Sequence, residues 1–348
     1  MSAPRTTIAS LSRDIRSEAD AYRYWESLRW GDNPRCAHCG ADGEDVYLIP
    51  PANGTSRKTA AGSMSERRVW KCRPCKKQFS VLTGTIMHAT KVPIRTWVLV
   101  TFDACSAKNG ISAREVERKY GVCPRTAWHM LHRIRQAMAG GDRLVTTMRG
   151  TVVADETWVG GEPKNRHAKD RSGVKGLTDK TPVLSLVNQV TGEVRSKVVP
   201  TVTANNLRKF MSEQVDMSAS ELWTDSAKHY GAIGGEFARH QAVDHSKGEY
   251  VNRKGAGTNL AEGFFSQLKR SITGTHHHVS VEHLGRYCGE FDYRYSTCKM
   301  SDHGRVRTLA KQMEGRLSYK RLTEKGQAGW DSGASSPSVW DVVLSDVS

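Results

Sequence analysis

Long apolar runs are missing from this chain. The most apolar stretch, residues 92–107, is interrupted by Arg95 and Asp103, and a membrane-spanning helix requires about 18 consecutive apolar residues. Residues 1–25 carry charge throughout and have no apolar centre, so we do not expect a secretory signal. These absences predict a soluble, cytoplasmic protein without a membrane partner.

Acidic residues are scarce relative to basic ones. The 348-residue chain has 36 Asp and Glu against 52 Lys and Arg, which leaves a formal net charge of +16. An excess of this size favours a polyanionic partner, because clustered Lys and Arg gain most from releasing the counterions of nucleic acid. Disorder is not expected as the main state, since 38% of the residues are hydrophobic and nine are Trp. The length predicts two or three folded domains.

Closely spaced cysteines are also few, but they form a pattern. Cys36-Ala-His-Cys39 and Cys72-Arg-Pro-Cys75 are two CxxC motifs separated by residues 40–71. Four thiolates at this spacing hold one Zn²⁺ tetrahedrally and leave no open position for catalysis, so we expect a structural zinc ribbon over residues 31–90. It follows an N-terminal helical segment, 1–30, and contains an inserted loop at 53–65. The ribbon residues expected to face DNA phosphate are Arg67, Arg68, Lys76 and Lys77.

Residues 91–140 predict a helical DNA-binding domain. A first helix is expected from Pro93 to about residue 107, and a second begins at the Ser112 cap and stops at Gly121. A third, basic helix over 125–138 completes a helix-turn-helix suited to a major groove, with plain helical packing as the alternative. We expect it to turn Arg125, His129, His132, Arg133 and Arg135 outward, and to use Arg125, His129 and Arg133 on DNA.

Residues 148–300 predict an α/β domain. Apolar alternation and turn residues give strands at 149–161, 182–190, 193–199, 221–224 and 238–243, a helix at 204–215 and an exposed loop at 162–180. Asp155 and Asp225 lie where strands give way to loops, the places where α/β sheets build their sites. Residues 301–348 are expected to form an extension with a flexible tail from Gly326.

A third carboxylate is expected from a helix over 258–270. Its core face carries Leu260, Phe264, Phe265 and Leu268, and its opposite face carries Glu262, Ser266 and Lys269. A carboxylate there can bind a metal ion while a lysine seven residues later holds a DNA phosphate, although a solvated amphipathic helix gives the same pattern. Phosphodiester chemistry with two divalent ions requires several such carboxylates to converge.

Several longer motifs point to one family. They are Gln78-Phe79-Ser80 and Thr83-Gly84-Thr85 after the CxxC pairs, the segments 154–161, 224–225 and 258–270, His278-Val279-Ser280 with His283-Leu284, Tyr287, and the segment 290–295. Through them the chain resembles bacterial insertion-sequence transposases that combine a zinc ribbon, a helix-turn-helix and an RNase-H-like DDE domain. The match is specifically to the family numbered fifteen ninety-five, with its ISXO-type catalytic domain.

The resemblance implies a fold, a reaction and its ligands. The fold is an RNase-H-like mixed sheet with flanking helices, and Asp155 and Asp225 are the first two ligands of Mg²⁺ or Mn²⁺. Members differ at the third ligand, so both Asn259 and Glu262 are candidates; we favour Glu262 because a carboxylate binds Mg²⁺ better than an amide oxygen, and Asn259 can be a helix cap. Lys269 and Arg270 are expected to contact DNA.

The implied reaction is metal-dependent cleavage at transposon ends, followed by attack of the freed 3′-hydroxyl on target DNA. The partners are therefore double-stranded DNA and further copies of the chain, in a dimer or a larger assembly. Two alternatives remain: a zinc-dependent DNA-binding protein that has lost catalysis, and an RNase-H-like nuclease or resolvase. Glu156 is expected on the opposite face of its strand, and His229, His245 and 276–278 are expected to be ordinary loop histidines.

Overall fold

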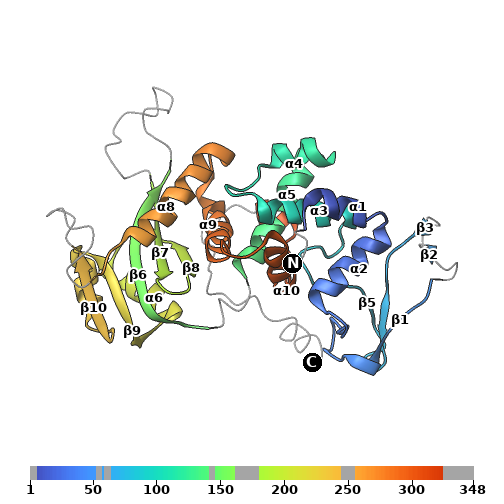
Figure 1. Ribbon diagram of the computed structural model, residues 1–348, viewed down its shortest axis with the longest axis horizontal. Coiled ribbons are helices and arrows are strands. Elements are labelled where there is room, and N and C mark those ends of the chain that lie inside the picture. The colour runs from blue at the N-terminus through green and yellow to red at the C-terminus, as the bar shows by residue number, and fades with distance from the viewer. Residues whose placement is uncertain are drawn as a thin grey trace, which may run out of the picture.

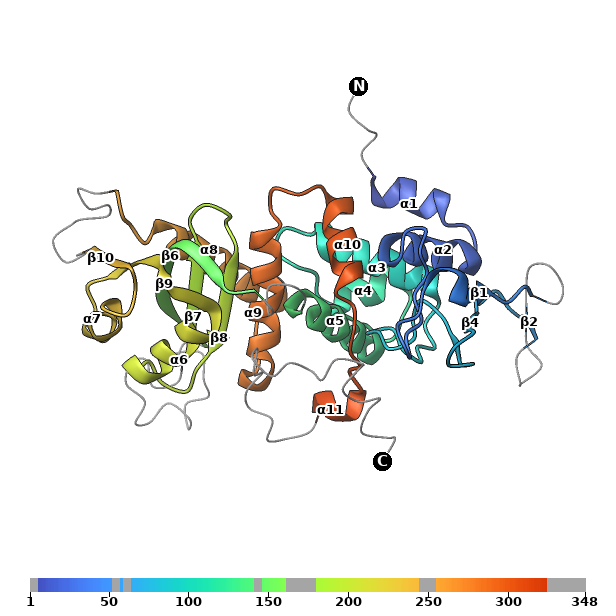
Figure 2. The same ribbon diagram turned by 90° about the horizontal axis from the view of Figure 1, so that it is seen from below.

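The structure is a computed structural model that describes residues 6–51, 57–58, 64–140, 146–160, 180–243 and 255–323. Within these ranges a helical part, which includes the small sheet of the zinc ribbon, lies beside an α/β part (Figures 1 and 2). Several expectations concern segments that fall wholly or partly outside the described residues. They are the loop at 53–65, the loop at 162–180, His245 and the tail from Gly326.

The N-terminal part starts with two helices, α1 (Ile8–Asp14) and α2 (Glu18–Arg29), each opened by a capping box. A short 3₁₀ turn, Gly43–Asp45, leads into the ribbon sheet. That sheet contains β1 (Val46–Leu48), β4 (Trp70–Cys72) and β5 (Gln78–Phe79) in antiparallel order β1-β4-β5. A separate pair, β2 (Arg57–Lys58) and β3 (Met64–Ser65), lies in the described part of the inserted segment.

Three helices follow the ribbon, as predicted: α3 (Ile94–Ser106), α4 (Ala113–Tyr120) and α5 (Pro124–Ala139). The Ser112 side chain accepts a hydrogen bond from the Glu115 N–H, and Gly121 ends α4 with a left-handed φ of 65°. Glycine adopts that conformation without steric cost, which explains why α4 ends there.

The end of the described chain returns to these helices. Helix α10 (Asp302–Lys311) contributes to the same core as α2, α3 and α5. Beyond α10 the backbone pairs with the chain that follows β5. The Ile86 N–H donates to the Met313 carbonyl oxygen at 2.8 Å. A short helix, α11 (Tyr319–Thr323), then lies beside α5. The core shared by these helices contains Trp25, Trp97, Leu131, Ile134, Val306 and Leu309.

The α/β part is built on the mixed sheet that the sequence predicts. Its strands are β6 (Met148–Val159), β7 (Thr181–Asn188), β8 (Val194–Val198), β9 (Val215–Asp225) and β10 (Arg239–Val243). They are ordered β10-β9-β6-β7-β8, with β6-β7 and β7-β8 antiparallel and β10-β9 and β9-β6 parallel. Strand β9 is longer than the predicted 221–224, because it begins directly after the preceding helix.

Helices cover both faces of the sheet. Helices α6 (Ala204–Gln214) and α7 (Lys228–Gly234) pack Leu207, Phe210 and Tyr230 on one face. Helices α8 (Asn259–Ser271) and α9 (Val281–Ser296), joined through a π-helical turn at Ile272–His276, cover the other face with Phe264 and Phe291. Neither α7 nor α9 was predicted as a helix from the sequence.

Helix α9 connects the two parts of the molecule (Figure 2). Toward α5, the Arg135 and Arg294 guanidinium groups each lie 2.6 Å from the buried Glu290 carboxylate. Toward the sheet, the Asp292 carboxylate accepts from the Ser196 N–H at 2.8 Å and from its hydroxyl at 2.7 Å. Glu290 and Asp292 are two residues apart and so point to opposite sides of one helix, which lets α9 hold the helical part and the sheet edge together.

The predicted outward orientation of two α5 residues is wrong. His132 is fully buried among Trp128, His283 and Tyr287, and Arg135 is buried in the ion pair with Glu290. Both side chains face α9, which arrives more than 140 residues later in the sequence. A basic helix that looks amphipathic by itself therefore has a second buried face.

Candidate functional site

Two predicted carboxylates lie on adjacent strands of the sheet. Strands β6 and β9 are parallel and pair Val153 with Trp223, which both pack in the core beneath α8. Side chains two residues further along a strand return to the same face. Asp155 and Asp225, each two residues beyond this pair, therefore share the α8 face at neighbouring positions.

Glu262, in the first turn of α8, is the third acid at this place. Burial, together with the negative charges of Glu156, Asp225 and Glu262, raises the pKa of Asp155 to about 7. The helix that carries Glu262 packs Phe264 on Val153 and Trp223 of the two strands, which puts its first turn on the same side of the sheet as Asp155. Its Oε1 atom also accepts a hydrogen bond from the Thr258 hydroxyl at 3.0 Å.

The exposed face of α8 agrees with the predicted face. Glu262, Ser266 and Lys269 are exposed, whereas Phe264, Phe265 and Leu268 are buried. Asn259 is also exposed and is the first residue of the helix, while Thr258 occupies the cap position. Arg270 is exposed and donates to the Ser266 hydroxyl at 3.4 Å.

Glu156 points to the other face of the sheet, as its position in the strand predicts. Its carboxylate accepts a 2.5 Å hydrogen bond from the Tyr230 hydroxyl and lies 3.3 Å from His229 Nε2. His229 and Tyr230 are on α7, directly after Asp225. Glu156 therefore ties the segment that follows Asp225 to the strand that carries Asp155, and His229, expected to be an ordinary loop histidine, has a specific partner.

This donor set suits a hard divalent cation. Carboxylate oxygens are the ligands that Mg²⁺ and Mn²⁺ take in proteins, and an acid with a raised pKa gains most from a nearby positive charge. Among the described residues, the carboxylates do not form a group as tight as the cysteine cluster described next.

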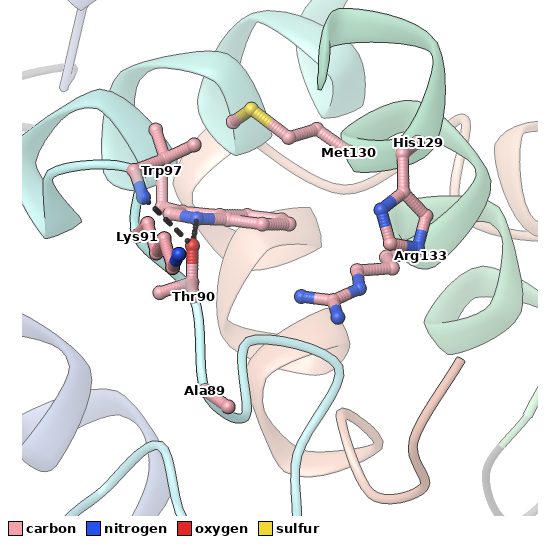
Figure 3. A pocket seen from close by; sticks show the side chains of 8 residues that line it. Ala89, Thr90, Lys91, Trp97, His129, Met130 and Arg133 are labelled. Carbon is pink, nitrogen blue, oxygen red and sulfur yellow. Dashed lines mark hydrogen bonds between the residues drawn. The ribbon is translucent and has the colours of Figure 1, made fainter. Parts of the chain in front are cut away.

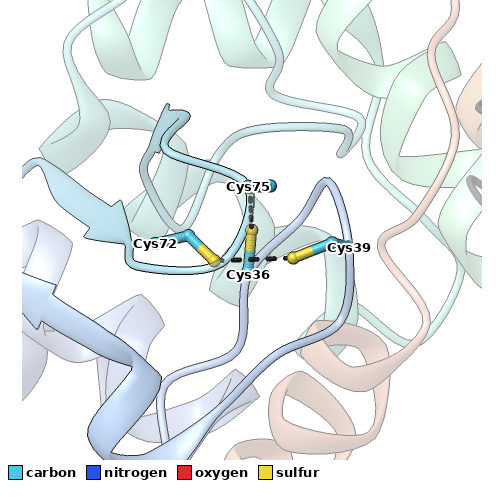
Figure 4. Close-up of side chains that lie close together, drawn as sticks. All are labelled: Cys36, Cys39, Cys72 and Cys75. Atoms are coloured by element: carbon cyan, nitrogen blue, oxygen red, sulfur yellow. Dashed lines mark hydrogen bonds between the residues drawn. The ribbon is translucent and has the colours of Figure 1, made fainter.

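The four predicted zinc ligands do converge (Figure 4). The sulfur atoms of Cys36, Cys39, Cys72 and Cys75 all lie within 4.8 Å of one another. Gly40 and Lys76, which follow the two CxxC pairs, both have left-handed φ angles, 80° and 60°, and so turn the chain around the sulfurs. Burial raises the pKa of the Cys72 thiol to about 12, so its thiolate requires a cation beside it.

The basic residues predicted in the ribbon differ in their surroundings. Arg67, Lys76 and Lys77 are exposed. Arg68 instead lies 2.7 Å from the buried Glu26 of α2, whose other oxygen accepts from the Trp70 indole N–H at 2.8 Å. The Arg68 side chain thus holds the ribbon to α2.

The three α5 residues predicted to contact DNA touch the end of the described chain. The Arg125 guanidinium lies 4.1 Å from the centre of the Tyr319 ring. His129 Nε2 lies 3.0 Å from the Leu317 carbonyl oxygen, which also accepts from Arg133 Nε at 3.1 Å. Segment 317–319 therefore covers part of the face that the sequence analysis assigned to the DNA groove. No sequence periodicity links two segments so far apart.

Comparison with known proteins defines the class. Residues 147–296 match the ISXO2-like transposase domain, and residues 16–78 match the transposase zinc-ribbon domain. Together these segments make up more than half of the chain, and they are the segments that contain the carboxylates and the cysteine cluster. The protein is thus of the zinc-ribbon DDE transposase class. It belongs to the insertion-sequence family numbered fifteen ninety-five.

A curated relative extends over most of the chain. A protein of Halobacterium salinarum, described as an uncharacterized protein in transposable element ISH50, is 24% identical over 304 residues, which cover 84% of this chain and 96% of that protein.

The helices of the described ranges include none with the length and apolar character needed to cross a membrane.

Proposed function

We propose that this protein is an active transposase that binds the terminal inverted repeats of its insertion sequence, cleaves the DNA there and joins the freed ends to target DNA. The observation that carries the proposal is the placement of Asp155, Asp225 and Glu262 at one side of the sheet, within the segment that matches a DDE transposase domain. The mixed sheet, with helices on both faces, supports an RNase-H-like assignment for this domain.

The carboxylates would act as metal ligands. Two Mg²⁺ or Mn²⁺ ions, when bound, supply activation of the attacking oxygen and stabilisation of the leaving oxygen in an in-line displacement. Asp155 and Asp225 would hold the ions from the two strands, and Glu262 would hold them from α8. Lys269, about two turns further along α8, would hold a DNA phosphate beside them.

Glu262 and Asn259 remain competing assignments for the third ligand. The electrostatic effect of Glu262 on Asp155 favours Glu262. If Glu262 is the ligand, Glu262→Gln lowers cleavage by several orders of magnitude while Asn259→Ala lowers it slightly. The reverse order of effects would assign the ligand to Asn259.

A cleavage assay on DNA carrying the ends of the element tests the activity. We expect the zinc-loaded protein with Mg²⁺ or Mn²⁺ to nick this DNA, and Asp155→Asn and Asp225→Asn to abolish nicking. Asp216→Asn is the matched control, because Asp216 lies at the other end of β9 and pairs with Arg149. Binding without nicking would favour a DNA-binding protein, and nicking without joined products would favour a nuclease or resolvase.

DNA recognition is part of the same proposal. The ribbon, with exposed Arg67, Lys76 and Lys77, and the helix pair α4–α5, as a helix-turn-helix, would hold the double-stranded ends. Because transposition brings two ends together, a homodimer or a larger assembly in the bacterial cytoplasm is expected by analogy with the family. Size measurement by light scattering, with and without end DNA, checks the assembly.

A further inference from the structure

A cavity opens between residues 89–92, which precede α3, and helix α5 (Figure 3). Its volume is about 240 Å³. The Trp97 indole and Met130 provide apolar walls, and Figure 3 shows the Arg133 guanidinium reaching from α5 into the space beside Trp97. The lining residues are Ala89, Thr90, Lys91, Val92, Trp97, His129, Met130 and Arg133.

The wall that carries Lys91 is held in place by hydrogen bonds. The Thr90 hydroxyl oxygen accepts from the Trp97 indole N–H at 2.9 Å and from the Val92 N–H at 3.1 Å. Ala89, just before, has a left-handed φ of 53°, which turns the chain toward α5. The loop is therefore fixed to α3 before any ligand arrives, so binding there costs little ordering entropy.

Arg133 is a half-buried cation whose hydrogen-bonding capacity is only partly used. Its Nε atom donates to the Leu317 carbonyl oxygen, and within the described ranges no acidic side chain forms an ion pair with it. Burial lowers its pKa, which reflects the cost of removing an unpaired guanidinium from water. The terminal nitrogens, which have a fork geometry suited to phosphate oxygens, face the cavity.

Further cations surround this place. Burial lowers the pKa of His88, and the charges of Arg316, Arg133, Arg67 and His38 lower it further. An acid is also nearby, because the backbone of Glu314 pairs with that of Thr85, but its carboxylate lies 3.9 Å from the Arg29 guanidinium. Arg67 of the ribbon and Arg316 of the chain after α10 are both exposed.

We propose that this cavity is a binding site for a backbone phosphate of DNA, with Arg133 as the inner donor and Lys91 at the opening, and that the exposed Arg67 and Arg316 contact neighbouring phosphates of the same strand. The cations come from the ribbon, from α5 and from the chain after α10, so they cover more surface than one small anion occupies and suit consecutive phosphates of a strand. The inference rests on the proposed DNA-binding function and assigns the place where α5 and the ribbon hold the same DNA.

The salt dependence of binding provides the test. Each lost phosphate contact reduces the slope of log K against log salt by about 0.9. The experiment uses full-length, zinc-loaded Asp155→Asn protein, which is expected to bind DNA without cutting it, and duplex DNA that carries an end of the element. Arg133→Gln in this background is expected to reduce the slope by about one and to weaken binding to unrelated duplexes as well. Arg133→Lys, which keeps the charge, should restore most of the slope.

Arg208→Gln is the matched control, because Arg208 is an exposed arginine of α6 paired with Glu236 in the α/β part. It should leave the slope unchanged. An unchanged slope in a folded Arg133→Gln variant would overturn the proposal. If that variant fails to fold, Lys91→Gln, at an exposed position, must show the same loss, and an unchanged slope there would overturn it too.

Two further results separate the possible ligands and proposals. Inorganic phosphate at millimolar concentration, or a mononucleotide at the concentration of the duplex phosphates, is added as a competitor. Displacement of the duplex by either one would indicate a small-anion site and would overturn the DNA assignment. If Arg133→Gln reduces the slope but the protein with an intact Asp155 never cleaves DNA, the transposase activity is refuted and the phosphate site is not. A protein that cleaves with an unchanged slope would refute the phosphate site alone.

Discussion

Asp155 is the carboxylate whose pKa is raised by the other negative charges of the site. It is largely buried, and Glu156, Asp225 and Glu262 all place negative charge near it, which together raise its pKa to about 7. The divalent ions proposed for this site would offset the repulsion among these acids. Such a residue is expected to reduce folding stability while it serves binding.

The first prediction concerns this charge. Because the folded-state pKa of Asp155 lies above the ordinary value of 3.8, the folded protein loses stability as pH rises from about 4 to about 7. Asp155→Asn should therefore raise the unfolding free energy of zinc-loaded protein without Mg²⁺ at pH 8 by up to about 4 kcal/mol, and its melting temperature should rise accordingly. At pH 4 the gain should vanish.

The same melting experiment includes its own checks. Asp216→Asn, on the same strand, should give no such gain at pH 8. Added Mg²⁺ should stabilise the wild-type protein but not Asp155→Asn, because the ion removes the repulsion only where the carboxylates are present. A variant as stable as wild type at both pH values would contradict the assignment of this charge.

Individual residues were predictable where they depend on strand alternation. The two-residue period put Asp155 and Glu156 on opposite faces, and both side chains have the neighbours that follow from it. Partners that come from distant segments were not predictable in this way. Arg68 was assigned to DNA as an isolated basic residue, and its contact with Glu26 depends on how α2 packs against the ribbon.

At the scale of single elements, the ribbon is too small to fold on its core alone. Its core within the described residues is formed by Val46, Phe79 and two of the cysteines, with Trp30 and Trp70 beside them. A structural zinc ion supplies folding free energy that so few apolar side chains cannot provide.

The second prediction tests this dependence. Metal analysis should find one zinc per chain, and Cys72→Ser should lose the zinc and the folded ribbon, detected by proteolysis within 31–90. Cys298→Ser is the control, because Cys298 is an exposed free cysteine outside the cluster. A full zinc content in Cys72→Ser would exclude this residue as a ligand.

Most elements of the α/β part followed from the sequence, because alternating apolar residues and turn signals define strands locally. Helix α5 shows where local patterns fail. Its boundaries were predicted to within a residue or two, yet His132 and Arg135 point into α9. Gly289 of α9 approaches Ala139 so closely that a Cβ atom on it would lie 2.6 Å from the Ala139 Cβ. Such a contact requires knowledge of both helices.

At the scale of the whole molecule, one buried acid joins the two parts. Glu290 is fully buried, and burial opposes its ionisation, but the Arg135 and Arg294 guanidinium groups outweigh this effect and lower its pKa to about 2. The stability that this charge contributes is therefore present above the ordinary pKa of 4.5 and is lost as pH falls toward 2.

The third prediction removes that acid. Glu290→Gln leaves two buried guanidinium groups without a counter-charge, so we expect a loss of about 3–5 kcal/mol in unfolding free energy at pH 7. Glu213→Gln, which breaks the more exposed pair with Lys197, should cost at most about 1 kcal/mol. Urea unfolding of both variants measures the difference, and equal small effects would show that Glu290 does not hold the parts together.

The return of α10 to the N-terminal helices has a consequence for synthesis. The core around Trp25 and Trp97 includes Val306, Leu309 and Met313, and the backbone at Ile86 pairs with Met313. These partners leave the ribosome only after the whole α/β part has been made, so the N-terminal helices cannot complete their packing during early elongation. A truncated or frameshifted product that ends before α10 would lack this core, and with it the wall that presents Arg133. If α5 holds DNA as proposed, only chains translated past the α/β part would present it on a completed core.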